Sequence, residues 1–189
     1  SNIQNGDIVL DFFAGSASTG HALIKYCSDH QVKASYIMIQ LDEDLDESLK
    51  TAETSAKRDI KLAIDFLDAI NKPHKISEIA IQRLRRAGVR YNIAEGFRSL
   101  TITDTNYKDV YRLAHTTTQQ ELLSTVDNVK EDRTELDLLY GVLTASALEL
   151  NRPLETRDIV GSDVFLYDYL GEASGLIACF AEPISEETI

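Results

Sequence analysis

Residues 8–20, IVLDFFAGSASTG, decide the fold of this chain. The apolar run Ile8-Val9-Leu10 ends at Asp11 and predicts a short buried strand over 8–12, because strands of a parallel sheet are covered on both faces. Two aromatic residues and then a string of small residues follow this strand. Such small side chains indicate a backbone that comes close to another group.

The segments that follow alternate between helical and extended patterns. Helices are predicted over 19–27, 46–70 and 79–87, the last from a Ser77 cap to a stop at Gly88, and strands over 35–41 and 97–102. The order strand, helix, strand, helix, strand is typical of a doubly wound α/β sheet. The first hundred residues therefore predict an α/β fold with a Rossmann-like sheet.

The rest of the chain has a different pattern. It predicts a polar, irregular or helical segment over 107–132, an amphipathic helix over 134–148, and strands over 164–169 and 176–181 joined as a hairpin through 171–175. We therefore expect two domains. Residues 1–107 would hold the doubly wound sheet, and residues 108–189 would form a C-terminal α+β extension.

The composition excludes several classes of protein. The chain has 189 residues, of which 43% are hydrophobic, so it is long enough for a substantial core. Its net charge of −12 argues against a surface that lies as a whole on DNA or on anionic lipid, although a local basic patch stays open. No apolar stretch is long enough to span a bilayer. Cys27 and Cys179 have no metal-ligating neighbours, which favours free thiols in a reducing compartment.

The loop after the first strand is the ligand-binding position of a doubly wound sheet. Gly15, Ala17 and Gly20 form a Gly-x-Gly-x-x-Gly-like frame with Ala in place of the second glycine. Backbone N–H groups of such a loop, together with the N-terminus of the following helix, attract an anionic group. No Lys follows the glycines, which argues against a Walker-type phosphate loop. A tight turn that only packs the strand against the helix is the alternative.

Residues on both sides of this frame favour a nucleoside-containing ligand. Asp11 ends the first strand, where its carboxylate accepts a hydrogen bond from a ligand's ammonium group or orders the loop. Phe12 and Phe13 offer an apolar wall for a flat ring or a sulfonium-bearing chain. The second strand ends in 40–43, QLDE, about 20 residues past the glycines, where the ribose of an adenosine lies in dinucleotide-binding folds. Nicotinamide dinucleotides and S-adenosylmethionine both carry that ribose.

Residues 11–19, DFFAGSAST, resemble the DxFxGSGTT motif of amino-group DNA methyltransferases. Residues 11–16, DFFAGS, resemble the form that this motif takes in the modification subunit of type III restriction-modification systems. Further segments are similar to that family in the family's own order: YIMIQL at 36–41, IAIQRLRRA at 79–87, GFR at 96–98, VKEDRTELDLL at 129–139 and LIACF at 176–180. The resemblance therefore covers nearly the whole chain.

Enzymes of this family transfer a methyl group from S-adenosylmethionine to the N6 amino group of adenine in DNA. The resemblance implies a cofactor-binding loop formed by Asp11, Phe12, Phe13, Ala14, Gly15, Ser16, Ala17, Ser18 and Thr19. It places the ribose-binding position on Gln40, with Asp42 as a candidate helper. Ala17 departs from the family's second glycine, and we expect its methyl group to crowd the methionine end of the cofactor. Asp42 departs from a position that is often Pro.

The family's catalytic motif, Asp/Asn-Pro-Pro-Tyr/Phe, is absent, because Pro73, Pro153 and Pro183 are not adjacent. In this family the motif, whose aromatic ring stacks on the flipped base, and the target-recognition segment both precede the cofactor loop. We therefore expect the C-terminal part of the enzyme, without catalytic residues of its own and inactive alone. The resemblance implies DNA as a partner through the missing parts, a restriction subunit, a homodimer of modification subunits, and a location in the bacterial cytoplasm.

An uncovered strand follows from this interpretation. The strand over 8–12 would be central in the intact sheet, and without its neighbour it would present an open apolar edge. We expect this edge to pair with another copy of the chain or with a rearranged segment.

Two other functions stay open. A nicotinamide-dependent dehydrogenase requires a complete nucleotide fold and a catalytic His or Tyr-Lys pair, which the sequence does not reveal. A non-catalytic assembly module, with a vestigial sheet and a C-terminal hairpin that binds a partner subunit, is favoured by Ala17 and by the missing catalytic half.

The sequence also leaves two alternative roles open for a basic cluster and for one histidine. Arg83, Arg85, Arg86 and Arg90 form either a phosphate contact or a solvated helix face paired with nearby acids. His21, just past the loop, faces the cofactor or is a surface or packing residue.

Overall fold

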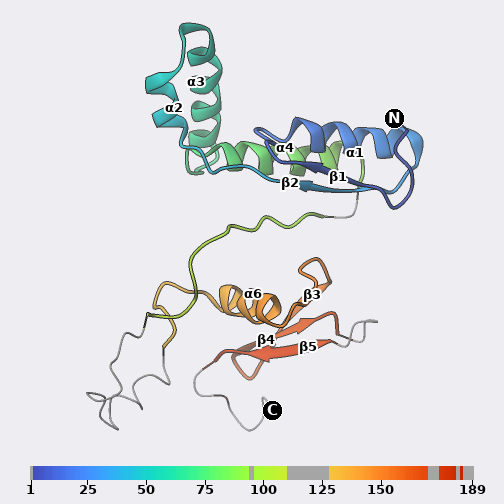
Figure 1. The fold of residues 1–189 in the computed structure, drawn as a ribbon, viewed down its shortest axis with the longest axis vertical. Coiled ribbons are helices and arrows are strands. Elements are labelled where there is room, and N and C mark those ends of the chain that lie inside the picture. Colours follow the sequence, from blue (N-terminus) through green and yellow to red (C-terminus); the bar gives the residue numbers. More distant parts are fainter. Residues whose placement is uncertain (1, 94–95, 110–127, 170–174, 182–183, 185–189) are drawn as a thin grey trace. The chain divides into compact units, whose positions relative to one another are not determined.

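The computed structural model describes residues 2–93, 96–109, 128–169, 175–181 and 184 of the chain. The chain forms two compact units, Ser1–Ser99 and Leu100–Ile189 (Figure 1). The division falls after Ser99, whereas the sequence analysis places the domain boundary after residue 107. Each unit combines helices with a small β-sheet, so the predicted α/β class is confirmed at that level.

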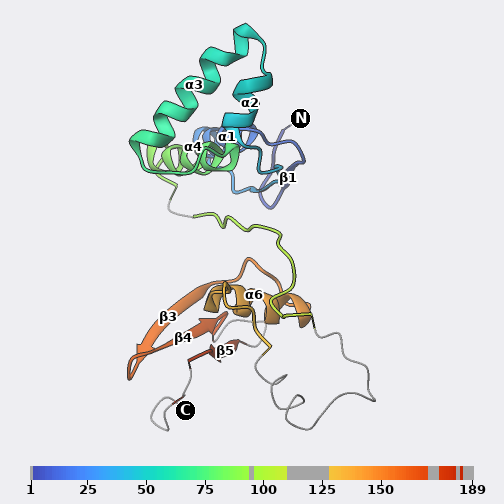
Figure 2. The ribbon, with the colours of Figure 1, turned by 90° about the vertical axis from the view of Figure 1, so that its left-hand side faces the viewer.

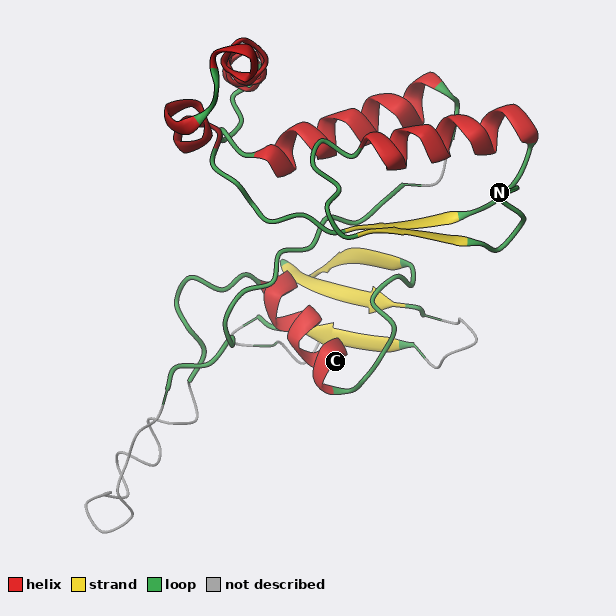
Figure 3. Cartoon of the chain, turned by 45° about the horizontal axis from the view of Figure 1, so that its top comes forward, coloured by secondary structure: helices red, strands yellow, loops and turns green. Residues whose placement is uncertain are grey.

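Two parallel strands form the sheet of the N-terminal unit. β1 (Ile8–Asp11) pairs along its full length with β2 (Ser35–Met38), and α1 (Ser18–His30) connects them. A helix is the usual connection between parallel neighbours, which cannot be joined by a tight turn. α1 and α4 (Ile76–Arg90) lie on the same face of the two strands (Figure 3). This unit confirms the first two predicted strands and the helix between them.

The core of the N-terminal unit lies between these helices and the sheet. Its buried members are Ala17, Ile24, Leu84 and Ala87, and Tyr36, Ala80, Tyr91, Ile93 and Phe97 pack against them. Gly20 permits the close approach of α1 to α4, because a Cβ at this position would lie 2.8 Å from Cδ2 of Leu84. The side chain of Met38 in β2 lies on the same spot, 3.6 Å from that Cβ position. Gly20 therefore has the packing role that the third glycine has in dinucleotide-binding folds.

The opposite face of β1 and β2 carries exposed apolar side chains. They are Ile8, Leu10, Ile37, Ile39 and Leu41, each more than 40% exposed. Because side chains alternate between the two faces of a strand, these residues lie on the face away from α1 and α4. Among the described residues, β1 pairs only with β2, and the predicted pairing of its other edge with a second copy stays a prediction.

A helical hairpin projects from the layer formed by α1 and α4 (Figures 1 and 2). Its helices, α2 (Leu45–Thr51) and α3 (Thr54–Ala69), correct the prediction of one continuous helix over 46–70. The chain leaves the helical conformation at Ala52, which has φ −66° and ψ 150°. Asp44 starts the hairpin as the N-cap of α2, since its carboxylate accepts from two backbone N–H groups of the first turn.

The base of the hairpin is closed by a backbone bridge between Asp44 and Lys75 and by the ring of His74. Nδ1 of His74 lies 2.9 Å from the carboxylate of Asp46 in α2, and Nε2 lies 2.9 Å from that of Asp68 in α3. These carboxylates, Asp68 before Asp46, raise the pKa of His74 above its ordinary value of 6.5. A protonated His74 therefore ties the two helices together.

α4 is longer at both ends than the helix predicted over 79–87. Ser77 lies inside its first turn, so the prediction that Ser77 caps this helix is wrong. The hydroxyl of Ser77 instead donates to the carboxylate of Asp42, 2.5 Å away. Gly88 lies inside the last turn and does not end the helix, which continues to Arg90.

The third strand predicted over 97–102 is wrong. Residues 96–103 have no regular secondary structure. Phe97 packs against the core, whereas Ile102 is 100% exposed. A strand needs a neighbour that satisfies its backbone hydrogen bonds, and none of the described strands pairs with this segment. Most of the following polar segment, 107–132, lies outside the described residues.

The described part of the C-terminal unit is a three-stranded antiparallel sheet covered by one helix. The strands are β3 (Leu154–Ile159), β4 (Ser162–Tyr167) and β5 (Leu176–Cys179), in the order β3-β4-β5, and the helix is α6 (Glu135–Ala145). Leu139 and Leu143 of α6 pack against Phe165 and Tyr167 of β4. The predicted helix and antiparallel strand pair are confirmed. β3 is not predicted from the sequence.

None of the helices in the described part of the chain combines the length and the apolarity that a bilayer crossing requires. Cys27 and Cys179 are free thiols, as predicted.

Candidate functional site

The loop over residues 11–19 begins where β1 ends and is held along β2. The backbone N–H of Ile39 donates to the carbonyl oxygen of Asp11 at 2.8 Å, and the N–H of Ala14 donates to the carbonyl oxygen of Ile39 at 3.1 Å. These two bonds continue the pattern of the sheet beyond its last paired residues. The first part of the loop therefore has a fixed position at the carboxyl edge of the sheet.

Asp11 orders the loop through its carboxylate. Oδ1 accepts a hydrogen bond from the backbone N–H of Phe13 at 3.1 Å. The hydroxyl of Thr19, in the first full turn of α1, donates to the same carboxylate. The Thr19 hydroxyl, and then the Phe13 N–H, lower the pKa of Asp11 from its ordinary value. Asp11 is therefore a carboxylate at neutral pH that joins both ends of the loop.

Gln40, beyond the end of β2, bonds the middle of the loop. Its Oε1 accepts from the backbone N–H of Gly15 at 2.6 Å, and its Nε2 donates to the carbonyl oxygen of Leu41 at 3.1 Å. Gly15 has a φ of +52°, and no atom lies within 4 Å of where its Cβ would be. The left-handed backbone favours glycine, and the open space beside it leaves room for another molecule. No periodicity in the sequence points to the bond between Gln40 and Gly15.

Ala17 departs from the expectation that its methyl group crowds a ligand. Ala17 is 0% exposed and belongs to the core cluster with Ile24, Leu84 and Ala87. Its methyl group therefore packs inside the unit. The backbone of Ala17 is left-handed, with φ 58° and ψ 40°, a conformation that costs a non-glycine residue about 1–2 kcal/mol.

The first backbone N–H groups of α1 have no side-chain acceptor at the N-cap. Ala17 is its N-cap and makes no side-chain hydrogen bond, and the first turn holds no acidic residue. The first helical bond runs from the N–H of His21 to the carbonyl oxygen of Ala17 at 3.1 Å. Unpaired N–H groups and the helix dipole together favour a negatively charged or oxygen-rich group here.

Two aromatic side chains stand beside this polar surface. Phe12 is 61% exposed and Phe13 is 88% exposed. Exposing such large apolar side chains is unfavourable in water, at about 25 cal/mol per Å². Their position in the loop therefore suits the apolar part of a ligand or of a partner surface.

The structure joins several of the residues that the resemblance implies through hydrogen bonds and leaves Asp42 apart. Asp11 accepts from Phe13 and Thr19, and the loop also holds the bonds from Ala17 to Ala14 and from Gly15 to Gln40. The carboxylate of Asp42 binds the hydroxyl of Ser77 in α4. Asp42 therefore anchors α4, and no hydrogen bond connects it to the loop.

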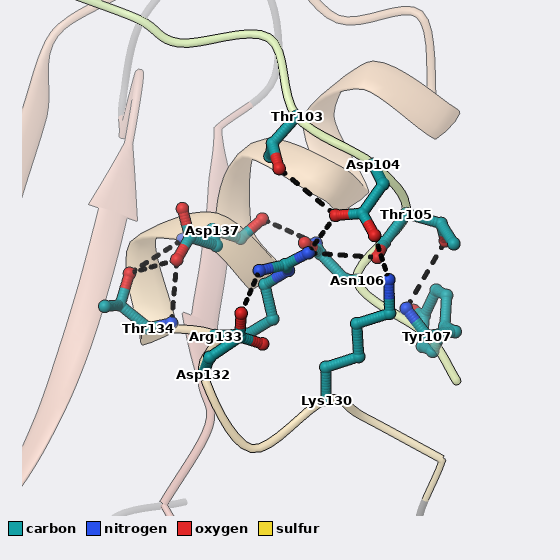
Figure 4. Close-up of polar contacts among 10 residues, drawn as sticks. All are labelled: Thr103, Asp104, Thr105, Asn106, Tyr107, Lys130, Asp132, Arg133, Thr134 and Asp137. Atoms are coloured by element: carbon teal, nitrogen blue, oxygen red, sulfur yellow. Dashed lines mark hydrogen bonds and ion pairs between the residues drawn. The ribbon is translucent and has the colours of Figure 1, made fainter. Parts of the chain in front are cut away.

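The segment 129–139 of the C-terminal unit has a structural explanation (Figure 4). Thr134 and Asp137 form a capping box at the start of α6. Arg133, whose side chain is 9% exposed, pairs with Asp132 and with Asp104, and Lys130 pairs with Asp104 as well. The polar residues of this segment therefore connect the start of α6 to the irregular stretch around Asp104.

Among the residues that the structure describes, no three His, Cys, Asp or Glu side chains gather in a way that could hold a metal ion. No protein-family model matches this chain, and no curated protein matches it either.

Proposed function

We propose that this chain is the cofactor-binding part of a DNA adenine N6-methyltransferase of the type III modification-subunit family, with S-adenosylmethionine as its cofactor. The observation that carries the proposal is the loop over 11–19. It lies at the carboxyl end of β1, is fixed by Asp11 and Gln40, and leads into an α1 N-terminus without a cap. In this proposal β1 and β2 are two strands of a doubly wound sheet that other parts of the enzyme complete.

The loop offers each part of S-adenosylmethionine a group of matching chemistry. The ionised carboxylate of Asp11 would accept a hydrogen bond from the ammonium group, and the free N–H groups of α1 would donate to the carboxylate. Phe12 and Phe13 would cover the apolar chain and the sulfonium, and Gln40 would hold the ribose hydroxyls. The cofactor supplies the methyl group, and the residues that hold the adenine would come from outside this chain.

Calorimetric titration of the chain with S-adenosylmethionine tests the proposal. We expect saturable binding, and a loss of about ten- to a hundredfold in affinity for Asp11→Asn, because a hydrogen bond to a charged group contributes about 1.5–3 kcal/mol. Asp7→Asn is the matched control. It makes the same change at the other end of β1, where the carboxylate of Asp7 accepts from the backbone N–H of Gln4 at 2.8 Å. NAD is the control ligand.

Each outcome of the titration supports or contradicts the proposed cofactor site. Binding of S-adenosylmethionine that Asp11→Asn weakens and Asp7→Asn leaves unchanged supports the proposal. Binding of NAD in its place would assign the loop to a nicotinamide dinucleotide. Absence of binding by both ligands refutes a cofactor site that this chain forms by itself.

The second candidate, an assembly module without catalysis, is favoured by the exposed apolar face of β1 and β2. Five apolar side chains on this face are between 44% and 76% exposed in the described part of the N-terminal unit. A patch of this kind marks a surface for another protein segment. In this case a restriction subunit or a second modification subunit would be retained by the chain even when Asp11 is changed.

A further inference from the structure

A groove of about 320 Å³ lies on the N-terminal unit between α1, α3 and α4, apart from the loop over 11–19. Its floor is apolar, from Phe66 of α3 and from Ile79 and Ala87 of α4. Its other lining residues are polar or charged: His21, Gln82, Arg83, Arg86 and Arg90. Every charged side chain in this groove is an arginine, in a chain with a net charge of −12.

The three arginines of the groove share one side of α4. At 3.6 residues per turn, positions 83, 86 and 90 fall within an arc of about 60°. Arg85 falls on another side of the helix and does not line the groove. At a rise of 1.5 Å per residue, Arg83 and Arg90 are about 10 Å apart along the axis. Because a strand winds around the duplex, its neighbouring phosphates lie farther apart in space than the 3.4 Å rise along the axis, so a row of this length reaches about two to three of them.

Two of these three arginines, Arg86 and Arg90, lie over aromatic rings. The guanidinium of Arg86 lies 4.6 Å above the centre of the Phe66 ring, and that of Arg90 lies 5.6 Å from the centre of the Tyr91 ring. Within the described residues, Arg83, Arg86 and Arg90 make no ion pair with a carboxylate. Among the described residues, the structure therefore gives no support to the alternative in which acids pair with this helix face. A guanidinium group that stacks on a ring keeps its N–H donors available for a bidentate contact with a phosphate.

We propose that this arginine groove binds consecutive phosphates of one strand of duplex DNA. The proposal rests on the proposed function in one respect, since the methyltransferase assignment selects DNA as the source of the phosphates. The groove holds three cations in a row long enough to reach neighbouring phosphates of one strand, and α4 is packed in the core through Leu84 and Ala87. It gives the chain a DNA contact in spite of its overall acidity. Phosphate contacts of this kind fix orientation and are independent of base sequence.

The test uses the full chain and a fluorescent 20-base-pair duplex of arbitrary sequence, with anisotropy measured over a range of salt concentrations. The test variant is Arg83→Gln/Arg86→Gln/Arg90→Gln. The matched control is Lys57→Gln/Arg58→Gln/Arg85→Gln, which removes the same number of positive charges from exposed positions of α3 and α4 outside the groove. Circular dichroism confirms that both variants keep their helices.

We expect the test variant to lose at least tenfold in affinity, and its slope of log K against log salt to become shallower by about 2–3, at about 0.9 for each phosphate contact. We expect the control to change affinity by less than threefold. An equal loss in both variants, or no binding of the duplex by the unmodified chain, overturns the proposal. Tighter binding to phosphatidylglycerol vesicles than to the duplex also overturns it, because lipid phosphates would then be the ligand.

The failure of this proposal is distinguishable from the failure of the proposed function. Titration of S-adenosylmethionine into the test variant probes the loop over 11–19, which contains none of the changed residues. If the unmodified chain binds S-adenosylmethionine but not the duplex, only the groove proposal is refuted. If the unmodified chain does not bind S-adenosylmethionine, the methyltransferase proposal is refuted.

Discussion

Replacing Gly141 of α6 by Ala should destabilise the C-terminal unit only while Asn106 is present. A Cβ at Gly141 would lie 2.5 Å from Nδ2 of Asn106, which donates to the carbonyl oxygen of Asp137 at 2.7 Å. Gly141→Ala therefore displaces the amide and removes a bond of about 1 kcal/mol, and displacing packed atoms adds about another 1 kcal/mol. Ala stabilises a helix interior by about 1 kcal/mol relative to Gly. The net expectation is a destabilisation of about 1 kcal/mol.

The double variant separates these contributions. With Asn106→Ala in place, the contact is gone and Gly141→Ala should stabilise the C-terminal unit by about 1 kcal/mol. The coupling energy between the two positions is then about 2 kcal/mol. Gly88→Ala in α4 is the matched control, since its nearest atom would be 3.9 Å from the new Cβ, and it should stabilise the N-terminal unit.

Hydrogen exchange measured by mass spectrometry at increasing urea gives the unfolding free energy of each unit from its own peptides. The reasoning is refuted if Gly141→Ala stabilises the C-terminal unit equally with and without Asn106. It is also refuted if Gly88→Ala destabilises the N-terminal unit by 1 kcal/mol or more.

Three further predictions concern other sites. The stabilisation from His74 should be fully present below its unfolded pKa near 6.5 and lost as the pH rises through its raised folded pKa; a folded pKa at or below 6.5 in an NMR titration would contradict this. Thr134→Ala should destabilise the C-terminal unit by about 1 kcal/mol in urea unfolding, whereas Thr134→Ser should not, because serine also caps a helix. Gly15→Ala should destabilise the N-terminal unit by about 1 kcal/mol through its positive φ alone, and an unchanged midpoint would show that the loop relaxes.

The first strand, the small-residue loop and the following helix could be predicted because each has a strong local signal. An apolar run, a cluster of small residues and a helical period follow one another within 30 residues. Loop geometry beyond that depends on residues from elsewhere in the chain. The hydrogen bond from Gly15 to Gln40 joins positions 25 residues apart, and the local sequence pattern around either residue does not predict it.

The errors have physical causes that act at a distance. The helical period continues from α2 into α3, so the break at Ala52 is visible only once the contacts of His74 close the base of the hairpin. Residues 99–102 alternate between polar and apolar as in a strand, but the segment 97–102 lacks a partner strand among the described residues. β3 was missed because Glu155 to Asp158 are all exposed and polar or charged, as is usual in an edge strand, so no apolar alternation marks it.

The contact between Gly20 and Leu84 has an evolutionary consequence. Any side chain at position 20 enters the space of Cδ2 of Leu84, while Met38 occupies the neighbouring space. Substitution at one of these positions is therefore conditional on the other. In homologous chains, residues larger than glycine at position 20 should occur together with residues smaller than leucine at position 84. The two positions should covary although 63 residues and two helices separate them, and lineages should pass through the smaller residue at 84 first.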